Sequence, residues 1–216
     1  MLSTLQSGGP GMERPRLMDR LWSPGMGGDR LLFIARPDEA MREVFDASTR
    51  EQGIQASTGL AMFPLVNWHQ TLSDRFIDTP DTRDLLRRAG DGIQLRGFTL
   101  ALDRLRISPN ERQSANVELC CSQDVDGLKQ LIVALKAAIA GQDLLTTRSG
   151  HRPHVTLSYR HHTDVKRQQS HPIRTIAWAI DSFELVVGSG DPYRYQTLAR
   201  WALAPSKPPT LQSSLF

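Results

Sequence analysis

The tetrapeptide His-x-Thr-Leu occurs twice in this chain, each time within an alternating pattern that predicts a β-strand. The copies are HQTL at residues 69–72 and HVTL at residues 154–157. Side chains two positions apart in a strand point to the same face, so each histidine shares a face with the threonine of its motif. The two copies lie too far apart to form one local motif. We therefore expect a fold with two halves, each contributing one of these strands.

Two matched histidines on strands are suited to acid–base chemistry at a phosphodiester. Such a reaction needs a base that deprotonates the nucleophile and an acid that protonates the leaving oxygen. Histidine serves in both roles because its ordinary pKa is about 6.5. The hydroxyls of Thr71 and Thr156 would donate to non-bridging phosphate oxygens, so His69 and His154 are the candidate catalytic residues. In the alternative interpretation each histidine is only a satisfied strand residue, which explains a single motif better than a matched pair.

Composition is typical of a globular protein with a mild preference for anionic partners. The 216 residues are 39% hydrophobic and 23% charged, with a net charge of +3 and a pI near 9.1. This length is enough for one α/β domain with a substantial core, or for two small domains. The excess positive charge is largely arginine, which favours phosphate-bearing partners. A charge of this size is equally compatible with a role in solubility alone.

Cysteine usage and hydropathy favour a reducing, cytoplasmic location. Cys120 and Cys121 are adjacent, and neighbouring cysteines rarely pair because the disulfide would strain the backbone. The first residues contain no basic segment followed by an apolar stretch, so no secretory signal is expected. No apolar run reaches the roughly 18 residues needed to span a bilayer. We therefore expect no membrane partner.

The order of the predicted elements indicates an α/β (α+β) fold. Helical periodicity, caps and acidic first turns predict helices at residues 37–48, 79–92 and 124–141. Apolar and alternating patterns predict strands at residues 30–36, 67–72, 93–107, 115–121, 155–159, 173–188 and 193–203. This order predicts two sheets that face each other across a cleft. A flexible leader (1–28) and a flexible tail (204–216) would flank one domain at residues 29–203.

Four segments of the chain resemble the 2H phosphoesterase superfamily, and within it the 2′-5′ RNA ligase-like proteins, also called RNA 2′,3′-cyclic phosphodiesterases. They are RLLFIARPDEAMREVF, NWHQTL, FTLALDRLRI and HRPHVTLSYR, and the resemblance covers roughly residues 29–203. It implies a bilobal fold with pseudo-twofold symmetry, two mainly antiparallel sheets facing a central cleft, and helices outside. It also implies hydrolysis of a 2′,3′-cyclic phosphate to a 2′-phosphomonoester, possible in reverse as 2′-5′ RNA ligation. No metal and no nucleotide cofactor are expected.

The resemblance also implies roles for the motif residues. His69 would donate a proton to the leaving 3′ oxygen, and His154 would accept a proton from the attacking water. Thr71 and Thr156 would hold the phosphate, and the histidine roles would reverse in the ligation direction. The chain departs from the family pattern at residues 73–76, where SDRF replaces a common Phe-Leu-Gly. This departure changes the local substrate contacts rather than the histidine.

Further residues beside the motifs are candidates for substrate binding. Arg75, Arg152 and Arg160 could each bind a phosphate in a bidentate manner, with a solvated surface arginine as the alternative. Tyr159 could stack on a base, with core packing as the alternative. The histidines of the second segment lack the Cys or Asp that would complete a metal site, so no metal ligands are expected. The expected partners are RNA with cyclic phosphate ends or small cyclic nucleotides.

A separate resemblance concerns the last residues, Gln212–Phe216. The sequence QSSLF resembles the short Gln-x-x-Leu-Phe peptides that bind the bacterial sliding clamp. Such short motifs arise easily by chance. The alternative function is accordingly a non-catalytic RNA-binding or clamp-tethered adaptor with the same fold. The presence of both histidine motifs favours the enzyme.

Overall fold

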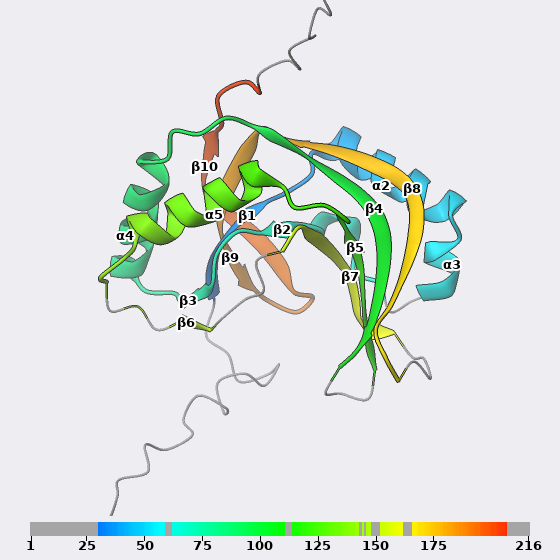
Figure 1. The fold of residues 1–216 in the computed structure, drawn as a ribbon. Coiled ribbons are helices and arrows are strands. Elements are labelled where there is room, and N and C mark those ends of the chain that lie inside the picture. The colour runs from blue at the N-terminus through cyan, green and yellow to red at the C-terminus, as the bar shows by residue number, and fades with distance from the viewer. Residues whose placement is uncertain are drawn as a thin grey trace, which may run out of the picture.

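The structure, a computed structural model, consists of two antiparallel sheets with helices packed around them (Figure 1). It describes residues 30–58, 62–110, 114–142, 144, 146–147, 152–161 and 166–206. The predicted leader and the Gln212–Phe216 motif lie outside these residues. The predicted α+β fold with two mainly antiparallel sheets is confirmed.

The first sheet has six strands and is centred on β1 (Arg30–Ala35). Its order is β10-β9-β1-β3-β6, and β2 also pairs with β1. The sequence RLLFIA of β1 is buried at every position after the first, as expected of a central strand covered on both faces. The other strands are β2 (Gln70–Thr71), β3 (Arg75–Ile77), β6 (Thr146–Thr147), β9 (Ser182–Ser189) and β10 (Arg194–Ala202).

The second sheet has four strands in the order β7-β5-β4-β8. They are β4 (Phe98–Pro109), β5 (Ala115–Cys120), β7 (His154–His161) and β8 (Gln169–Ile180). The prediction of one continuous strand over residues 173–188 is wrong, because the chain passes from one sheet to the other at Asp181. Ile180 pairs with Phe98 in the four-stranded sheet, whereas Ser182 pairs with Ala202 in the six-stranded sheet.

Each sheet carries one histidine motif at a corresponding place. The pairing path β2-β1-β9-β10 in one sheet matches β7-β5-β4-β8 in the other, and a motif lies on the first strand of each path. The first motif strand is much shorter than predicted. The segment before it forms a 3-10 turn, η2 (Leu65–Asn67), and only Gln70 and Thr71 pair with β1.

Two of the helices begin at a side-chain cap. Helix α2 (Glu39–Glu51) follows Asp38, which accepts a hydrogen bond from the backbone N of Met41. Helix α4 (Pro80–Asp91) follows Thr79, which caps it in the same way. The remaining helices are α3 (Ile54–Thr58), which the sequence did not predict, and α5 (Asp126–Ala138). In the part of the chain that is described, no helix has both the length and the apolar character to cross a membrane.

A large hydrophobic core joins the two sheets through aromatic contacts. The ring of Phe45 on α2 meets Trp68 and Trp178 edge to face, with centroid distances of 5.7 Å in both pairs. Trp178 lies on β8, and Trp68 directly precedes the histidine of the first motif. The indole N–H of Trp68 donates to the carbonyl of Phe63 at 3.0 Å. This packing fixes the backbone from which His69 projects.

Helix α4 has Gly90 in its last turn, and Gly92 forms its C-cap. A tertiary contact explains the glycine at position 90. Trp201 of β10 lies directly against Gly90, so that a Cβ there would come within 2.4 Å of the indole ring. Trp201 is held by stacking on Phe183 and by a hydrogen bond from its Nε1 to Asp91.

Replacing Gly90 should therefore destabilise the protein although alanine is the better helix former. We expect Gly90→Ala to lower the free energy of unfolding by about 1–3 kcal/mol, because overpacking outweighs the gain of under about 1 kcal/mol in helix propensity. Gly92→Ala is the matched control, since a Cβ there meets nothing closer than 3.7 Å. Denaturant unfolding of both variants checks this, and equal stability would contradict the proposed contact.

Candidate active site

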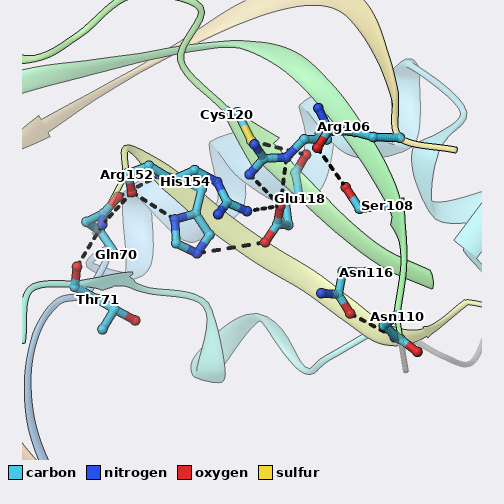
Figure 2. A network of polar contacts seen from close by, with 11 residues as sticks. Gln70, Thr71, Arg106, Ser108, Asn110, Asn116, Glu118, Cys120, Arg152 and His154 are labelled. Atoms are coloured by element: carbon cyan, nitrogen blue, oxygen red, sulfur yellow. Dashed lines mark hydrogen bonds and ion pairs between the residues drawn. The ribbon is translucent and has the colours of Figure 1, made fainter. Parts of the chain in front are cut away.

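The side chain of Gln70 links the two histidine motifs (Figure 2). His69 directly precedes β2, and His154 is the first residue of β7. The backbone N of His154 donates to Gln70 Oε1 at 2.7 Å. Gln70 Nε2 donates to the carbonyl of Arg152 at 3.1 Å. The two motifs, which come from different sheets, therefore lie side by side.

The two histidines are oriented by the same kind of hydrogen bond. His69 Nδ1 lies 2.7 Å from the carbonyl oxygen of Asn67, and His154 Nδ1 lies 2.8 Å from that of Arg152. In both cases the carbonyl belongs to the residue two positions earlier. A carbonyl only accepts hydrogen bonds, so Nδ1 must carry the proton. Nε2 of each ring is consequently the nitrogen that can exchange a proton with a substrate.

His69 lies in an environment that disfavours its charged form. Its ring packs against the edge of Tyr195 with a centroid distance of 4.8 Å. Burial is the main cause that lowers the pKa of His69, from 6.5 to about 4, and the charges of Arg75, His154 and Arg36 lower it further. The hydrogen bond to Asn67 acts in the opposite direction without overcoming these effects. In the unliganded protein His69 is therefore neutral at pH 7.

His154 instead faces a buried carboxylate. Glu118 on β5 is 4% exposed, and its Oε1 lies 3.9 Å from His154 Nε2. Its Oε2 accepts hydrogen bonds from Arg106 Nε at 2.9 Å, from Arg106 Nη2 at 2.6 Å and from Arg152 Nη2 at 2.6 Å. Figure 2 shows this carboxylate between the imidazole and the guanidinium groups. Glu118 can therefore stabilise positive charge that develops on His154.

A second buried ion pair lies on the His69 side. Arg36, which follows β1, donates from Nη2 to Glu184 Oε2 at 2.6 Å and to Thr197 Oγ1 at 2.7 Å. Thr197 in turn donates to Glu184 at 2.9 Å. Ala35, the residue before Arg36, pairs with Gln70 between β1 and β2. This pairing places Arg36 beside the first motif. Each histidine thus has an arginine–glutamate pair near it.

The other predicted site residues lie at several places around the histidines. Thr71 is buried and Thr156 is half-buried, opposite Glu118 in the strand register. Arg75 on β3 interacts with the phenol groups of Tyr159 and Tyr195. Tyr159 is exposed and packs edge to face on Phe63.

Of the two other predicted arginines, the structure describes the side chain of Arg152 alone. Arg152 is exposed and reaches Glu118, which brings it next to His154. Arg160 lies on β7, but its side chain is outside the described residues. Among the residues that are described, no group of three His, Cys, Asp or Glu side chains could hold a metal ion.

Sequence reasoning missed several polar residues of this site: Gln70, Arg106, Glu118, Glu184 and Tyr195. A signal was present for some of them. Glu118 interrupts the apolar strand ANVELC, and a charged residue at a buried strand position is rarely present without a partner. Gln70 likewise stands at a buried position between the histidine and the threonine of its motif.

The fold and the motifs can be compared with known proteins. No protein-family model matches the chain, and a comparison with curated proteins also gives no match. E. coli LigT in its apo form is 26% identical, with a TM-score of 0.61 over 82% of this chain and 98% of that one. A crystal structure described as a phosphoesterase is also 26% identical, with a TM-score of 0.64 over 82% and 99%. These similarities in fold and sequence are consistent with the 2H phosphoesterase superfamily.

Other solved structures extend the comparison. TT0787 of Thermus thermophilus shares the fold of this chain at 19% identity, with a TM-score of 0.62 over 82% of this chain and 100% of that one. E. coli LigT has also been crystallised with phosphate, with ATP, with 3′-AMP and with NADP+. The similarity to LigT-type proteins supports an enzyme activity of the phosphoesterase kind.

The low pKa of His69 predicts a pH dependence of stability. The folded pKa of about 4 lies below the ordinary value of 6.5, so the unfolded state binds more protons within this window. Stability is therefore lost as the pH falls through it. We expect wild type to lose up to about 3 kcal/mol more than His69→Gln, which does not titrate, between about pH 7 and pH 4. Urea unfolding across this range checks the difference, and parallel curves for the two proteins would contradict the burial of a neutral His69.

Proposed function

We propose that this protein is a metal-independent phosphodiesterase that hydrolyses RNA or nucleotide 2′,3′-cyclic phosphates to 2′-phosphates. The observation that carries the proposal is the matched pair of imidazoles. Both have Nδ1 bonded to a carbonyl, which leaves Nε2 for proton transfer. The Gln70 hydrogen bonds hold the two motifs side by side. An acid and a base in one site are what hydrolysis of a phosphodiester requires.

In the proposed reaction His154 Nε2 takes a proton from water as the water oxygen forms a bond to phosphorus. The bond from phosphorus to the 3′ oxygen breaks, and His69 Nε2 gives a proton to that oxygen. The product carries a 2′-phosphomonoester and a free 3′ hydroxyl. Thr71 and Thr156 donate to the non-bridging oxygens. Glu118 stabilises the imidazolium that forms on His154, from its position 3.9 Å away.

His69 must gain a proton before it can act as the acid. Burial and nearby positive charge keep it neutral in the free protein. A bound phosphodiester brings a negative charge into the same region, which offsets Arg75 and Arg36 and so favours the imidazolium. Once protonated, a histidine with a low intrinsic pKa is also a strong proton donor. Substrate binding and protonation of His69 are therefore coupled in this mechanism.

Two side chains support a nucleotide as the substrate. The exposed ring of Tyr159 lies beside Arg75, and an aromatic ring with a guanidinium can stack on a base. Arg75, Arg152 and Arg160 are proposed to bind phosphate groups. That LigT has been crystallised with 3′-AMP and NADP+ supports a ligand of this class. The structure does not describe Gln212–Phe216, and the similar proteins do not support the predicted clamp contact, so it is not part of the proposal.

The first test uses a short RNA that ends in a 2′,3′-cyclic phosphate, in the presence of EDTA. Wild type should yield a 2′-phosphate, and His69→Ala and His154→Ala should each lose about 10²–10⁴-fold in kcat, because each removes one proton transfer. His171→Ala is the matched control, since His171 is exposed on β8. RNA binding without hydrolysis by wild type would sink the proposal and favour the adaptor interpretation.

The roles of the two histidines can be tested with a changed leaving group. In a substrate whose 3′ oxygen is replaced by sulfur, the thiolate leaves without needing a proton. His69→Ala should then recover most of its lost activity, whereas His154→Ala should stay impaired because water must still be deprotonated. Rates on the oxygen and sulfur substrates give this ratio for each variant. Recovery by His154→Ala alone would mean that the roles are reversed.

A further inference from the structure

We propose that Gln70 is a positioning residue, whose amide holds the strand of His154 beside that of His69 and fixes the orientation of the His154 ring. This inference rests on the proposed function, because it assigns Gln70 to the same acid–base pair. It comes from a difference between two corresponding positions. Gln70 separates the histidine and threonine of the first motif, and Val155 separates those of the second. Both side chains are 0% exposed, so the fold alone does not require an amide at this position.

Both the oxygen and the nitrogen of the Gln70 amide make hydrogen bonds. Oε1 accepts from the backbone N of His154, while Nε2 donates to the carbonyls of Arg152 and of Thr71, the latter at 2.8 Å. A buried amide is unfavourable unless it is hydrogen-bonded in this way. Two of these bonds cross from the first motif to the second. The polar side chain is therefore compensated specifically by the other half of the site.

The place of Gln70 in the two sheets explains why a side chain makes this link. β2 consists of two residues and pairs with β1, whereas β7 pairs with β5. No ladder between β2 and β7 is present in the described sheets. At His154, where β7 begins, the backbone N–H donates to Gln70. The amide thus joins the two sheets at the point where the histidines must act together.

The link also reaches the imidazole. The carbonyl of Arg152 accepts from Gln70 Nε2 and from His154 Nδ1, at 3.1 and 2.8 Å. Figure 2 shows both bonds meeting at that carbonyl. The carbonyl of Arg152 determines which nitrogen of the His154 ring carries the proton. By fixing the position of this carbonyl, Gln70 also fixes the tautomer of His154. Gln70 therefore acts on His154 through the backbone without touching the reacting atoms.

The kinetic test compares Gln70→Leu with wild type on the cyclic phosphate RNA. We expect kcat to fall about 10- to 100-fold, because small displacements of a catalytic group cost this much, with KM changed less than about threefold. Thr49→Val is the matched control. Thr49 is buried on α2 and its hydroxyl donates to the carbonyl of Phe45 at 2.8 Å. It should be destabilised without this loss of kcat.

A spectroscopic test does not depend on turnover. The ¹⁵N chemical shifts of the imidazole nitrogens report the tautomer of neutral His154. Wild type and Thr49→Val should show protonated Nδ1, whereas Gln70→Leu should show a mixture with protonated Nε2. If wild type proves inactive on cyclic phosphates, the proposed function fails, but these spectra still test the link. An unchanged tautomer in a folded Gln70→Leu variant would overturn it.

A third variant separates positioning from simple stability. In Gln70→Glu the introduced carboxylate can still accept from His154 N, but it repels the carbonyls of Arg152 and Thr71. The protonated carboxyl can donate to one of them. We expect the activity of this variant relative to wild type to rise as the pH falls and the carboxyl gains its proton. A constant ratio across the pH range, together with a full kcat in Gln70→Leu, would exclude a positioning role.

Discussion

The burial of a polar side chain between two sheets is the constraint on which this site depends. The two histidine motifs lie at β2 and β7, which belong to different sheets, so main-chain pairing cannot set their spacing. The shared hydrophobic core brings the sheets together only approximately, because apolar contacts are not directional. The Gln70 amide adds direction, with bonds of 2.7 and 3.1 Å to the second motif. Core packing brings the two motifs close together, and the Gln70 amide sets their relative position.

The positive charges around the site favour the binding of an anion but disfavour a protonated histidine. Arg36, Arg75 and Arg152 surround the histidines, which suits an anionic ligand, yet positive charge also makes a neighbouring imidazolium unfavourable. Glu118 and Glu184 partly offset this effect, since each is buried against an arginine. The balance differs between the two sides. On the His69 side, burial and the charge of Arg75 lower the pKa of the histidine to about 4. The unliganded site therefore favours a ligand that brings negative charge.

The sequence predicted the elements with strong local signals and missed what depends on distant contacts. The cap at Thr79 and the apolar run of β1 act locally, and the structure has them. The pattern of residues 173–188 predicts one long strand with a bulge near Asp181, but the change of pairing partners there depends on strands far along the chain. The histidine motifs could be recognised from the repeated tetrapeptide alone. Glu118 could have been noticed as a charge in an apolar strand, but its partners Arg106 and Arg152 come from separate segments of the chain.

A site of two related halves still has to make its two histidines different. In identical environments both would have the same affinity for protons, and neither would be favoured as acid or as base. The halves share the carbonyl bond to Nδ1 but diverge in what faces each ring. Tyr195 packs on His69, whereas Glu118 faces Nε2 of His154. In the proposed mechanism Glu118 would stabilise the imidazolium that forms on His154, and burial would make a protonated His69 the stronger acid. The direction of proton transfer would then arise from the residues around the motifs, which differ while the motifs themselves are alike.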